Sequence, residues 1–412
     1  MTDPDPTMLL TTLIFAATYF GLAIGKVPGL RVDRAGIALI GAAAVLASGL
    51  LDLPDAARAV DYQTIVLLFS MMVVVAYLNL SGFFAVVTEA IADYFGAPMP
   101  MLATTIGLSG FLSAFLVNDV VCVALTPLVV GLCRRLRRPP MPYLIGLAAA
   151  ANVGSVATIT GNPQNIMIGS FSGISYLRFC AKLGPIALVG LVVTFIVVAW
   201  VYRKQLVVAP WSSPRRRPLV QVHRPLLVKS VAITLATVVL FFAGQPISLV
   251  ALTAAGVMML SRVRPEKIYR AVDWPLLVMF TGLFVVVHAF EVNVVHAWNL
   301  DRWQSLRQSP VVMVSGLSVG LSNLVSNVPA VLLFKPLIEV TSQQERAWLA
   351  LSMSSTLAGN LTLLGSVANL IVVESARRSG AEISFLEYLK VGLPLTLLTT
   401  GLGVAWLQWV SY

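Results

Sequence analysis

Charged residues are scarce in this sequence. Only 11% of the 412 residues are Asp, Glu, Lys or Arg, whereas 58% are hydrophobic. Average soluble domains carry roughly a quarter charged residues, because their surface has to be hydrated. The composition therefore excludes a soluble enzyme with one anchor and a secreted disulfide scaffold. It predicts an all-α polytopic membrane protein.

Cysteine and histidine are also rare. The cysteines Cys122, Cys133 and Cys180 and the three histidines lack the spacing of metal ligands, so we expect no metal and no redox site. No segment of the form G-x-x-x-x-G-K-S/T is present, which argues against ATP hydrolysis by this chain. We therefore expect neither a cofactor nor an enzymatic activity.

Apolar runs, by contrast, are abundant. A membrane helix needs about 20 apolar residues. Ten such runs begin at Met8, Ala35, Gln63, Met141, Ala181, Ser230, Ile247, Trp274, Ala347 and Val391. Two further stretches, 98–132 and 311–337, are too long for one span and too short for two. Each fits a re-entrant hairpin, in which two half-depth legs meet at a polar tip.

Cations predict the orientation of these spans. Most of the 28 Lys and Arg residues fall in five clusters, which begin at Lys26, Arg134, Arg203, Arg262 and Arg377. The positive-inside rule assigns all five clusters to the cytoplasm. Ten crossings then place both termini outside, with the first hairpin entering from the cytoplasm and the second from the other side. The net charge of +10 is thus a topology signal, and we expect no nucleic-acid partner.

The two halves of the chain carry matching landmarks. Asp61 and Asp273 are 212 residues apart, and Asn118 and Asn327 are 209 residues apart. Each half contains five crossings and one hairpin, and an odd number of crossings inverts the second copy. Inverted repeats with broken helices at the midplane are typical of secondary transporters.

We expect the following domain organisation. The first repeat covers 1–204, with its hairpin at 98–132 and a broken helix at 141–172. A basic cytoplasmic linker follows at 205–229. The second repeat covers 230–412, with its hairpin at 311–337 and a broken helix at 347–376.

Only two charged residues fall well inside apolar stretches, Asp119 and Lys335. An ionisable group inside a membrane is costly and is a functional candidate by default. Asp119 at the first hairpin tip is a candidate proton carrier or cation ligand, with the alternative that it only caps the following leg. Lys335 is a candidate charge partner, with the alternative that it extends toward the membrane surface.

Uncharged polar groups gather at the hairpin tips and at the breaks. Asn118 and Asn327 mark the tips, and Asn165 and Asn369 mark the breaks. The other candidate substrate or ion ligands are Thr160, Gly161, Ser326, Thr362, Gly365 and Ser366. Amides, hydroxyls and half-helix N-termini suit sodium, an oxyanion or a small neutral hydroxide. The alternative is that these residues only pack helices together.

Four segments resemble signatures of the ion transporter superfamily: FLVNDVVCVALTPLV, ATITGNPQNIMIG, LVSNVPAVLLFKPL and STLAGNLTLLGSVANLIV. This superfamily includes arsenite efflux permeases, sodium/proton antiporters, divalent-anion sodium symporters and plant silicon effluxers. The resemblance covers nearly the whole chain. It implies a scaffold domain, a transport domain and an elevator-like movement of the latter.

The hairpin tips distinguish between branches of this superfamily. Divalent-anion symporters carry Ser-Asn-Thr at both tips, whereas this chain reads Val117-Asn118-Asp119 and Ser326-Asn327-Val328. The Asn-Asp tip and the GNPQN segment are similar to the arsenite and silicon efflux branch. That similarity implies proton coupling and carries over Asn118, Asp119 and Asn165 as site positions.

We therefore expect a proton-coupled exporter of arsenite or antimonite in a prokaryotic plasma (inner) membrane. The scarcity of deep cations other than Lys335 fits such a neutral, small inorganic substrate. Alternatives are a sodium-coupled symporter of a carboxylate or inorganic anion, a sodium/proton antiporter and a channel-like scaffold. Besides the lipid bilayer, the resemblance leaves open a homodimer and an ATPase subunit as partners.

Overall fold

The computed structural model describes residues 6–24, 31–94, 97–206, 222–295, 310–339 and 341–410. These residues form helices and turns and contain no strand. The chain is a multi-pass membrane protein, and the expected fold class is confirmed. Of the basic linker expected at 205–229, residues 207–221 lie outside the described part of the chain.

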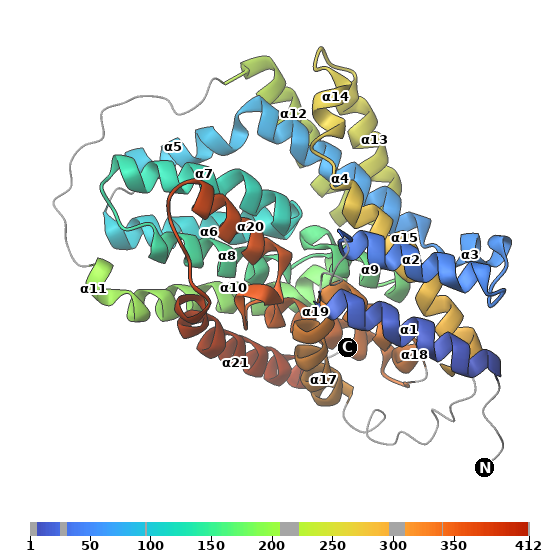
Figure 1. Cartoon of the computed structure of the whole chain (residues 1–412). Coiled ribbons are helices and arrows are strands. Elements are labelled where there is room, and N and C mark those ends of the chain that lie inside the picture. Colours follow the sequence, from blue (N-terminus) through green and yellow to red (C-terminus); the bar gives the residue numbers. More distant parts are fainter. Residues whose placement is uncertain are drawn as a thin grey trace.

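The first half contains long helices, short connecting helices and an interrupted helix, and Figure 1 shows their arrangement. Its elements are α1 (Pro6–Ile24), α2 (Arg34–Ala47), α3 (Leu53–Ala59), α4 (Tyr62–Ser81), α5 (Phe83–Tyr94), α6 (Pro98–Phe115), α7 (Asn118–Arg135), α8 (Met141–Ser155), the 3-10 turn η1 (Ile159–Gly161), α9 (Pro163–Ser172), α10 (Tyr176–Val201) and α11 (Arg203–Leu206).

The second half repeats this order. Its elements are α12 (Arg224–Phe242), α13 (Ile247–Met259), α14 (Pro265–Tyr269), α15 (Trp274–Asn293), α17 (Pro310–Val325), α18 (Asn327–Glu339), α19 (Gln344–Ala358), the 3-10 turn η4 (Leu363–Gly365), α20 (Val367–Arg378) and α21 (Phe385–Trp409).

Equivalent helices begin with equivalent caps. Asp61 caps α4 and Asp273 caps α15, and both accept hydrogen bonds from the first backbone N–H groups of their helix. Ser175 and Ser384 do the same for α10 and α21. Helix packing follows this symmetry, because α2 packs on α15 while its counterpart α13 packs on α4. The two repeats are therefore interlocked through α2 with α15 and through α13 with α4.

Not all of the ten predicted crossings are full-length helices. Seven helices in the described part of the chain are long and apolar enough to cross a bilayer: α1, α4, α6, α10, α12, α15 and α21. Six of them correspond to predicted crossings. The seventh, α6, is the first leg of the hairpin expected at 98–132, and its 18 residues make it longer than the expected half-depth leg. The expectation of about 20 residues is wrong for α2 and α13, which have 14 and 13 residues. Helix α2 starts only after its cap Asp33 and ends just before Gly49, whose φ is +72°. Its 14 residues extend about 21 Å, less than a hydrocarbon core.

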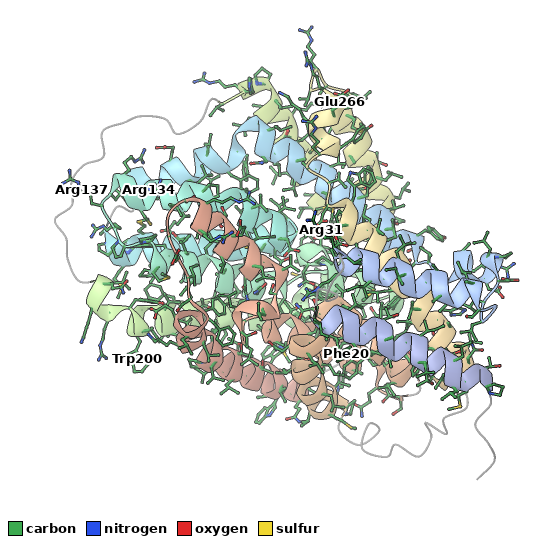
Figure 2. All side chains as sticks on the ribbon, viewed as in Figure 1. Phe20, Arg31, Arg134, Arg137, Trp200 and Glu266 are labelled. Carbon is green, nitrogen blue, oxygen red and sulfur yellow. The ribbon has the colours of Figure 1, made fainter. Side chains whose placement is uncertain are left out.

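Helices α8 and α19 occupy the centre of the molecule. In α8 all residues from Pro142 to Ser155 are buried, and α19 is buried from Ala347 to Ala358. Both helices are buried around their whole circumference over these residues, as expected for helices enclosed by others. Helix α8 packs against α6, α7 and α10, and α19 packs against α17, α18 and α21. Figure 2 shows the labelled Arg134 and Arg137 at the periphery, where α7 ends.

The contact between α6 and α8 requires a small residue. A methyl group placed on Gly154 of α8 would lie 2.1 Å from the carbonyl oxygen of Gly110 on α6. A backbone atom cannot move aside as a flexible side chain can, so only glycine permits this approach.

Replacing Gly154 by Ala should destabilise the protein by about 1–3 kcal/mol, because the two helices must separate. Denaturant titration of the purified chain in detergent would measure the change. Gly107→Ala on the exposed side of α6 is the matched control, since a methyl group there meets no atom within 4 Å. A Gly154→Ala variant as stable as the Gly107→Ala variant would contradict the packing argument.

Candidate functional site

Both hairpins turn immediately before an asparagine. In the first, α7 begins with Asn118 after the N-cap Val117, which provides no side-chain cap. In the second, Ser326 adopts a left-handed conformation with φ +79°, and α18 begins with Asn327. Non-glycine residues adopt this conformation rarely and at a cost in energy, and such residues cluster at functional sites. Asp119 is not the N-cap of α7, so the capping alternative is wrong.

The two broken helices are closed by equivalent asparagines. The side-chain amide of Asn165 donates to the carbonyls of Ser155 and Thr158, each at 3.0 Å. Asn369 donates to the carbonyls of Gly359 and Thr362 at 2.7 and 3.2 Å. All corresponding residues are 204 positions apart. Each asparagine thus satisfies backbone carbonyls that the interruption of the helix leaves without a helical partner.

Glycine permits the sharp course of each break. A methyl group on Gly161 would lie 2.1 Å from the carbonyl oxygen of Ser155, and one on Gly365 would lie 3.0 Å from that of Gly359. Gly161 and Gly365 were predicted as ligands. In the structure these glycines allow the backbone to turn sharply at each break.

Asn152 on α8 connects the two repeats. Its side-chain oxygen accepts hydrogen bonds from the Asn118 amide and the Ser366 hydroxyl, both at 3.0 Å. Its amide group donates to the side-chain oxygens of Asn360 and Asn369 at 2.8 and 3.0 Å. Two donors and two acceptor positions are all that an asparagine side chain offers. Asn152 therefore fixes the first hairpin tip against the second break.

Thr356 occupies the repeat-equivalent position on α19, 204 residues after Asn152. Its hydroxyl accepts hydrogen bonds from Asn162 at 3.1 Å and from Gln164 at 3.2 Å, and it donates to the side-chain oxygen of Asn165 at 3.4 Å. Ser352 also donates to Asn165, at 2.7 Å. Each central helix is thus bonded to the break of the other repeat.

A cavity of about 480 Å³ lies where the hairpin tips meet these breaks. The first residues of four half-helices line it: Asn118 and Asp119 of α7, Pro163 and Gln164 of α9, Asn327 and Val328 of α18, and Val367 of α20. Helix N-termini carry unpaired N–H groups and a partial positive charge. The cavity therefore offers several donors to the oxygen atoms of a small solute.

The cavity also contains acceptors without a protein partner. The side-chain oxygen of Asn327 is buried and has no hydrogen-bond partner among the described residues. The carboxylate of Asp119 likewise makes no ion pair or hydrogen bond that the described part of the chain provides. Buried polar atoms almost always have a partner, so the Asn327 oxygen is a candidate acceptor for a solute or an ion.

Three further charged residues line this cavity: Asp33, Arg34 and Asp273. The two carboxylates serve as helix caps, because Asp33 accepts from the Gly36 N–H at 2.8 Å and Asp273 accepts from the Leu276 N–H at 3.1 Å. The guanidinium of Arg34 has no acidic partner within the described ranges. The sequence suggested that Lys335 is the one cation near the site, but in the described structure Arg34 is the cation that lines the cavity.

Lys335 itself lies elsewhere. Its ammonium group is 3.6 Å from a Glu291 carboxylate oxygen and 3.7 Å from one of Glu339, and it lies 5.6 Å from the ring centre of Phe171. It does not line the 480 Å³ cavity. The structure thus pairs Lys335 with two carboxylates other than that of Asp119.

The predicted site residues divide into two groups. Those that line the cavity are Asn118, Asp119, Ser326, Asn327 and Ser366. Those that do not are Thr160, Gly161, Asn165, Thr362, Gly365, Asn369 and Lys335. Thr160 instead bonds the Tyr176 hydroxyl at 2.8 Å, and Thr362 bonds the Asn323 side chain at 3.3 Å.

Sequence reasoning missed Asn152, Gln164 and Arg34. Asn152 directly follows the alanine run 148–151, and its correspondence with Thr356 at the repeat offset of 204 residues was a usable signal. Gln164 lies inside the GNPQN segment. Arg34 belongs to the cation cluster that begins at Lys26, and no local pattern in the sequence places its side chain in a cavity.

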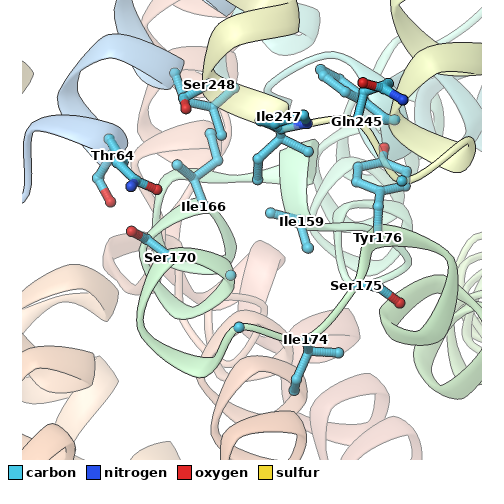
Figure 3. Close-up of a pocket in the computed structure, with 17 residues that line it drawn as sticks. Thr64, Ile159, Ile166, Ser170, Ile174, Ser175, Tyr176, Gln245, Ile247 and Ser248 are labelled. Atoms are coloured by element: carbon cyan, nitrogen blue, oxygen red, sulfur yellow. The ribbon is translucent and has the colours of Figure 1, made fainter.

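A second cavity, of about 250 Å³, lies at the repeat-equivalent position (Figure 3). Thr64 of α4, Tyr176 of α10 and Ile247 of α13 line it, together with Ile159 and Ile166 of the first broken helix. Neither hairpin tip contributes to its lining. The two cavities therefore differ in lining, and the described structure is asymmetric.

Known proteins with similar sequences support a transport function. The family model described as "Citrate transporter" (CitMHS) matches residues 13–350. The silicon efflux transporter LSI3 of Oryza sativa subsp. japonica is 29% identical, over 97% of this chain and 97% of the relative. The putative transporter arsB of Dictyostelium discoideum is 26% identical, over 96% and 90%. A 46 kDa membrane protein of Mycobacterium leprae is 28% identical, over 97% and 99%.

One solved structure covers nearly the whole chain. The YdaH transporter of Alcanivorax borkumensis superimposes with a TM-score of 0.60 and 15% identity, over 98% of both chains. At this identity the similarity concerns the fold alone.

Replacing Asn152 by Leu, a residue of similar size, should cost about 2–4 kcal/mol of stability, because four buried polar partners lose a hydrogen bond at once. Thermal unfolding of the purified protein in detergent would detect it. Ser113→Ala is the control, since the buried Ser113 hydroxyl has no partner among the described residues. If both variants unfold alike, Asn152 does not hold the tip to the break.

Proposed function

The chain belongs to the CitMHS citrate transporter family, and from that premise we propose that it exports arsenite or antimonite in exchange for protons. Its relatives are transporters, and so is this chain; it is not an enzyme. The resemblance to the ion transporter superfamily is confirmed. The membrane in this proposal is the plasma (inner) membrane of a prokaryote, with both termini outside.

The observation that carries the proposal is the composition of the 480 Å³ cavity. Half-helix N-termini and amide groups supply hydrogen-bond donors, while Asn327 and Asp119 supply acceptors without protein partners. A neutral inorganic hydroxide such as arsenious acid has both hydroxyl donors and oxygen acceptors. It fits such a mixed lining better than a fully charged oxyanion does, because three carboxylates and one guanidinium line the same cavity.

Two relatives support a substrate of this kind. LSI3 is named as a silicon efflux transporter, and the Dictyostelium relative is named arsB. Silicic and arsenious acids are both small hydroxides that are neutral near pH 7. The chain aligns with both relatives over nearly its whole length.

Asp119 is the group that we assign to proton coupling. It lines the cavity beside the tip residue Asn118 and has no cationic partner in the described part of the chain. A carboxylate in that position binds and releases a proton, and its charge changes by one unit each time. After the proton has left, the same oxygen atoms accept hydrogen bonds from the substrate. Substrate and proton then compete for one site, which is sufficient for antiport.

The movement that we infer is elevator-like. The cavity is bounded on one side by the tips and breaks (α7, α9, α18 and α20) and on the other by α2 and α15. Displacement of the tips and breaks relative to α2 and α15 would close this cavity and enlarge the 250 Å³ cavity beside α4 and α13. The inverted repeat makes the two end states related in shape.

Asp119→Asn should abolish proton-driven arsenite uptake into everted membrane vesicles, because the amide cannot exchange a proton. Arsenite/arsenite exchange without a gradient should persist, since the amide still forms hydrogen bonds. Asp55→Asn is the control, because Asp55 lies on the surface and pairs with Arg58. Proton-driven uptake by the Asp119→Asn variant at the control rate would refute the assignment.

A second function, sodium-coupled symport of a carboxylate, is favoured by Arg34. Its guanidinium lines the cavity without an acidic partner, and guanidinium groups bind carboxylates through paired hydrogen bonds. The family model is itself described by citrate.

Arg34→Gln separates the two functions. If citrate is transported, the variant should raise its KM by about tenfold, because a charge-assisted hydrogen bond is lost. If arsenite is transported, its KM should stay unchanged, because a neutral hydroxide does not need the guanidinium. Arg31→Gln, three residues earlier and outside the cavity lining, is the matched control for uptake with and without sodium.

A further inference from the structure

A second polar feature lies away from the transport cavity, around one end of α12, α13 and α14. It is a hollow of about 630 Å³. Figure 1 shows these three helices together at the upper edge of the molecule. Four cations line the hollow, Lys229, Arg262, Arg264 and Lys267, and no acidic residue belongs to its described lining. Glu266, labelled in Figure 2, precedes Lys267 but does not line it.

The walls of this basic hollow are held together by hydrogen bonds between distant segments. The backbone N–H of His223, before α12, donates to the carbonyl of Ser81 at the end of α4, at 3.3 Å. The Ser261 hydroxyl donates to the Tyr77 hydroxyl at 3.2 Å. The Lys229 ammonium donates to the carbonyl of Leu260 at 2.6 Å. The hollow is therefore a built part of the fold and exists before a ligand arrives.

Three of its four cations lack the partners that cations elsewhere in the described structure have. The side chains of Arg262, Arg264 and Lys267 form no ion pair or hydrogen bond in the described part of the chain. By contrast, Arg377 lies 3.0 Å from Glu374, and Lys390 lies 2.6 Å from Glu387. Like charges gathered without a counter-charge repel one another, and an anion that binds among them removes this repulsion.

An exposed apolar surface continues from the hollow. Helix α12 is apolar enough to cross a bilayer, yet only 17% of its span is buried within the protein. Val228 on α12 is 69% exposed, and Leu260 beside the hollow is 79% exposed. A ligand that covers both regions needs apolar chains joined to an anionic group, and this is the structure of an anionic phospholipid.

We propose that the basic hollow binds the headgroup phosphate of an anionic phospholipid, whose acyl chains lie along α12. Lys and Arg clusters at the ends of membrane helices attract such headgroups. The hollow adds a defined place for the phosphate, between α12 and the segment that joins α13 to α14. This site is independent of the substrate and of the coupling ion, and it fixes α12 and α13 at the membrane surface.

The test measures lipid binding to the purified full chain in a neutral detergent. Native mass spectrometry would compare the affinity for dioleoyl phosphatidylglycerol with that for dioleoyl phosphatidylcholine. The triple variant Arg262→Gln, Arg264→Gln, Lys267→Gln should bind phosphatidylglycerol at least about tenfold more weakly. A matched variant, Arg377→Gln, Arg378→Gln, Lys390→Gln, loses the same charge from residues paired with Glu374 and Glu387 and should bind normally.

Two further variants show whether a loss of lipid binding results from misfolding. Arg262→Lys with Arg264→Lys keeps the charge and should retain binding, whereas Leu260→Asp adds a carboxylate at an exposed position and should weaken it. An equal loss in both triple variants would overturn the proposal, as would equal affinity for phosphatidylcholine. Displacement of phosphatidylglycerol by millimolar inorganic phosphate would show that the hollow binds free phosphate instead.

Discussion

Helices that end inside an apolar environment must satisfy their own backbone groups, and the site of this protein follows from that constraint. Water cannot reach the interior to hydrogen-bond a freed carbonyl or N–H group. At the two breaks, Asn165 and Asn369 satisfy the carbonyls with their side-chain amides. The first residues of the half-helices α7, α9, α18 and α20 line a common cavity. The interruption that costs the helices their hydrogen bonds thereby creates a place for a ligand.

The two repeats have the same helix arrangement, whereas the site is lined by residues that differ between the repeats. Asn152 and Thr356 occupy equivalent positions and bond equivalent asparagines across the repeats. The tips, however, differ. Asn118 is held by Asn152, while the Asn327 oxygen has no partner among the described residues. Asp119 corresponds to Val328, so a single carboxylate faces the cavity from the tips. A symmetric site would carry two such carboxylates or none.

Much of the fold and part of the site could be predicted from local patterns. The hairpin tips were recognisable because an Asn interrupts a long apolar run, and the breaks because Gly161 and Gly365 interrupt otherwise helical patterns. The predicted Asn118, Asp119, Ser326, Asn327 and Ser366 line the cavity. Asn165 and Asn369 do not, since each lies on the third residue of its half-helix and turns back to the break. Sequence alone could not distinguish an asparagine that lines the cavity from one that hydrogen-bonds the backbone at a break, because both use the same side-chain amide.

Composition and charge placement, which act residue by residue, determined that this chain crosses a membrane, repeats itself and keeps nearly all its charges at the ends of helices. Tertiary structure alone decided which polar groups share a cavity. Asn152 meets Asn369 across 217 positions of sequence, Lys335 meets Glu291, and Arg34 reaches the cavity of Asp119. Such pairings depend on how whole helices pack. Hydrogen bonds and ion pairs act over only a few ångströms, and the spacing of residues in the sequence does not specify which distant residues come that close.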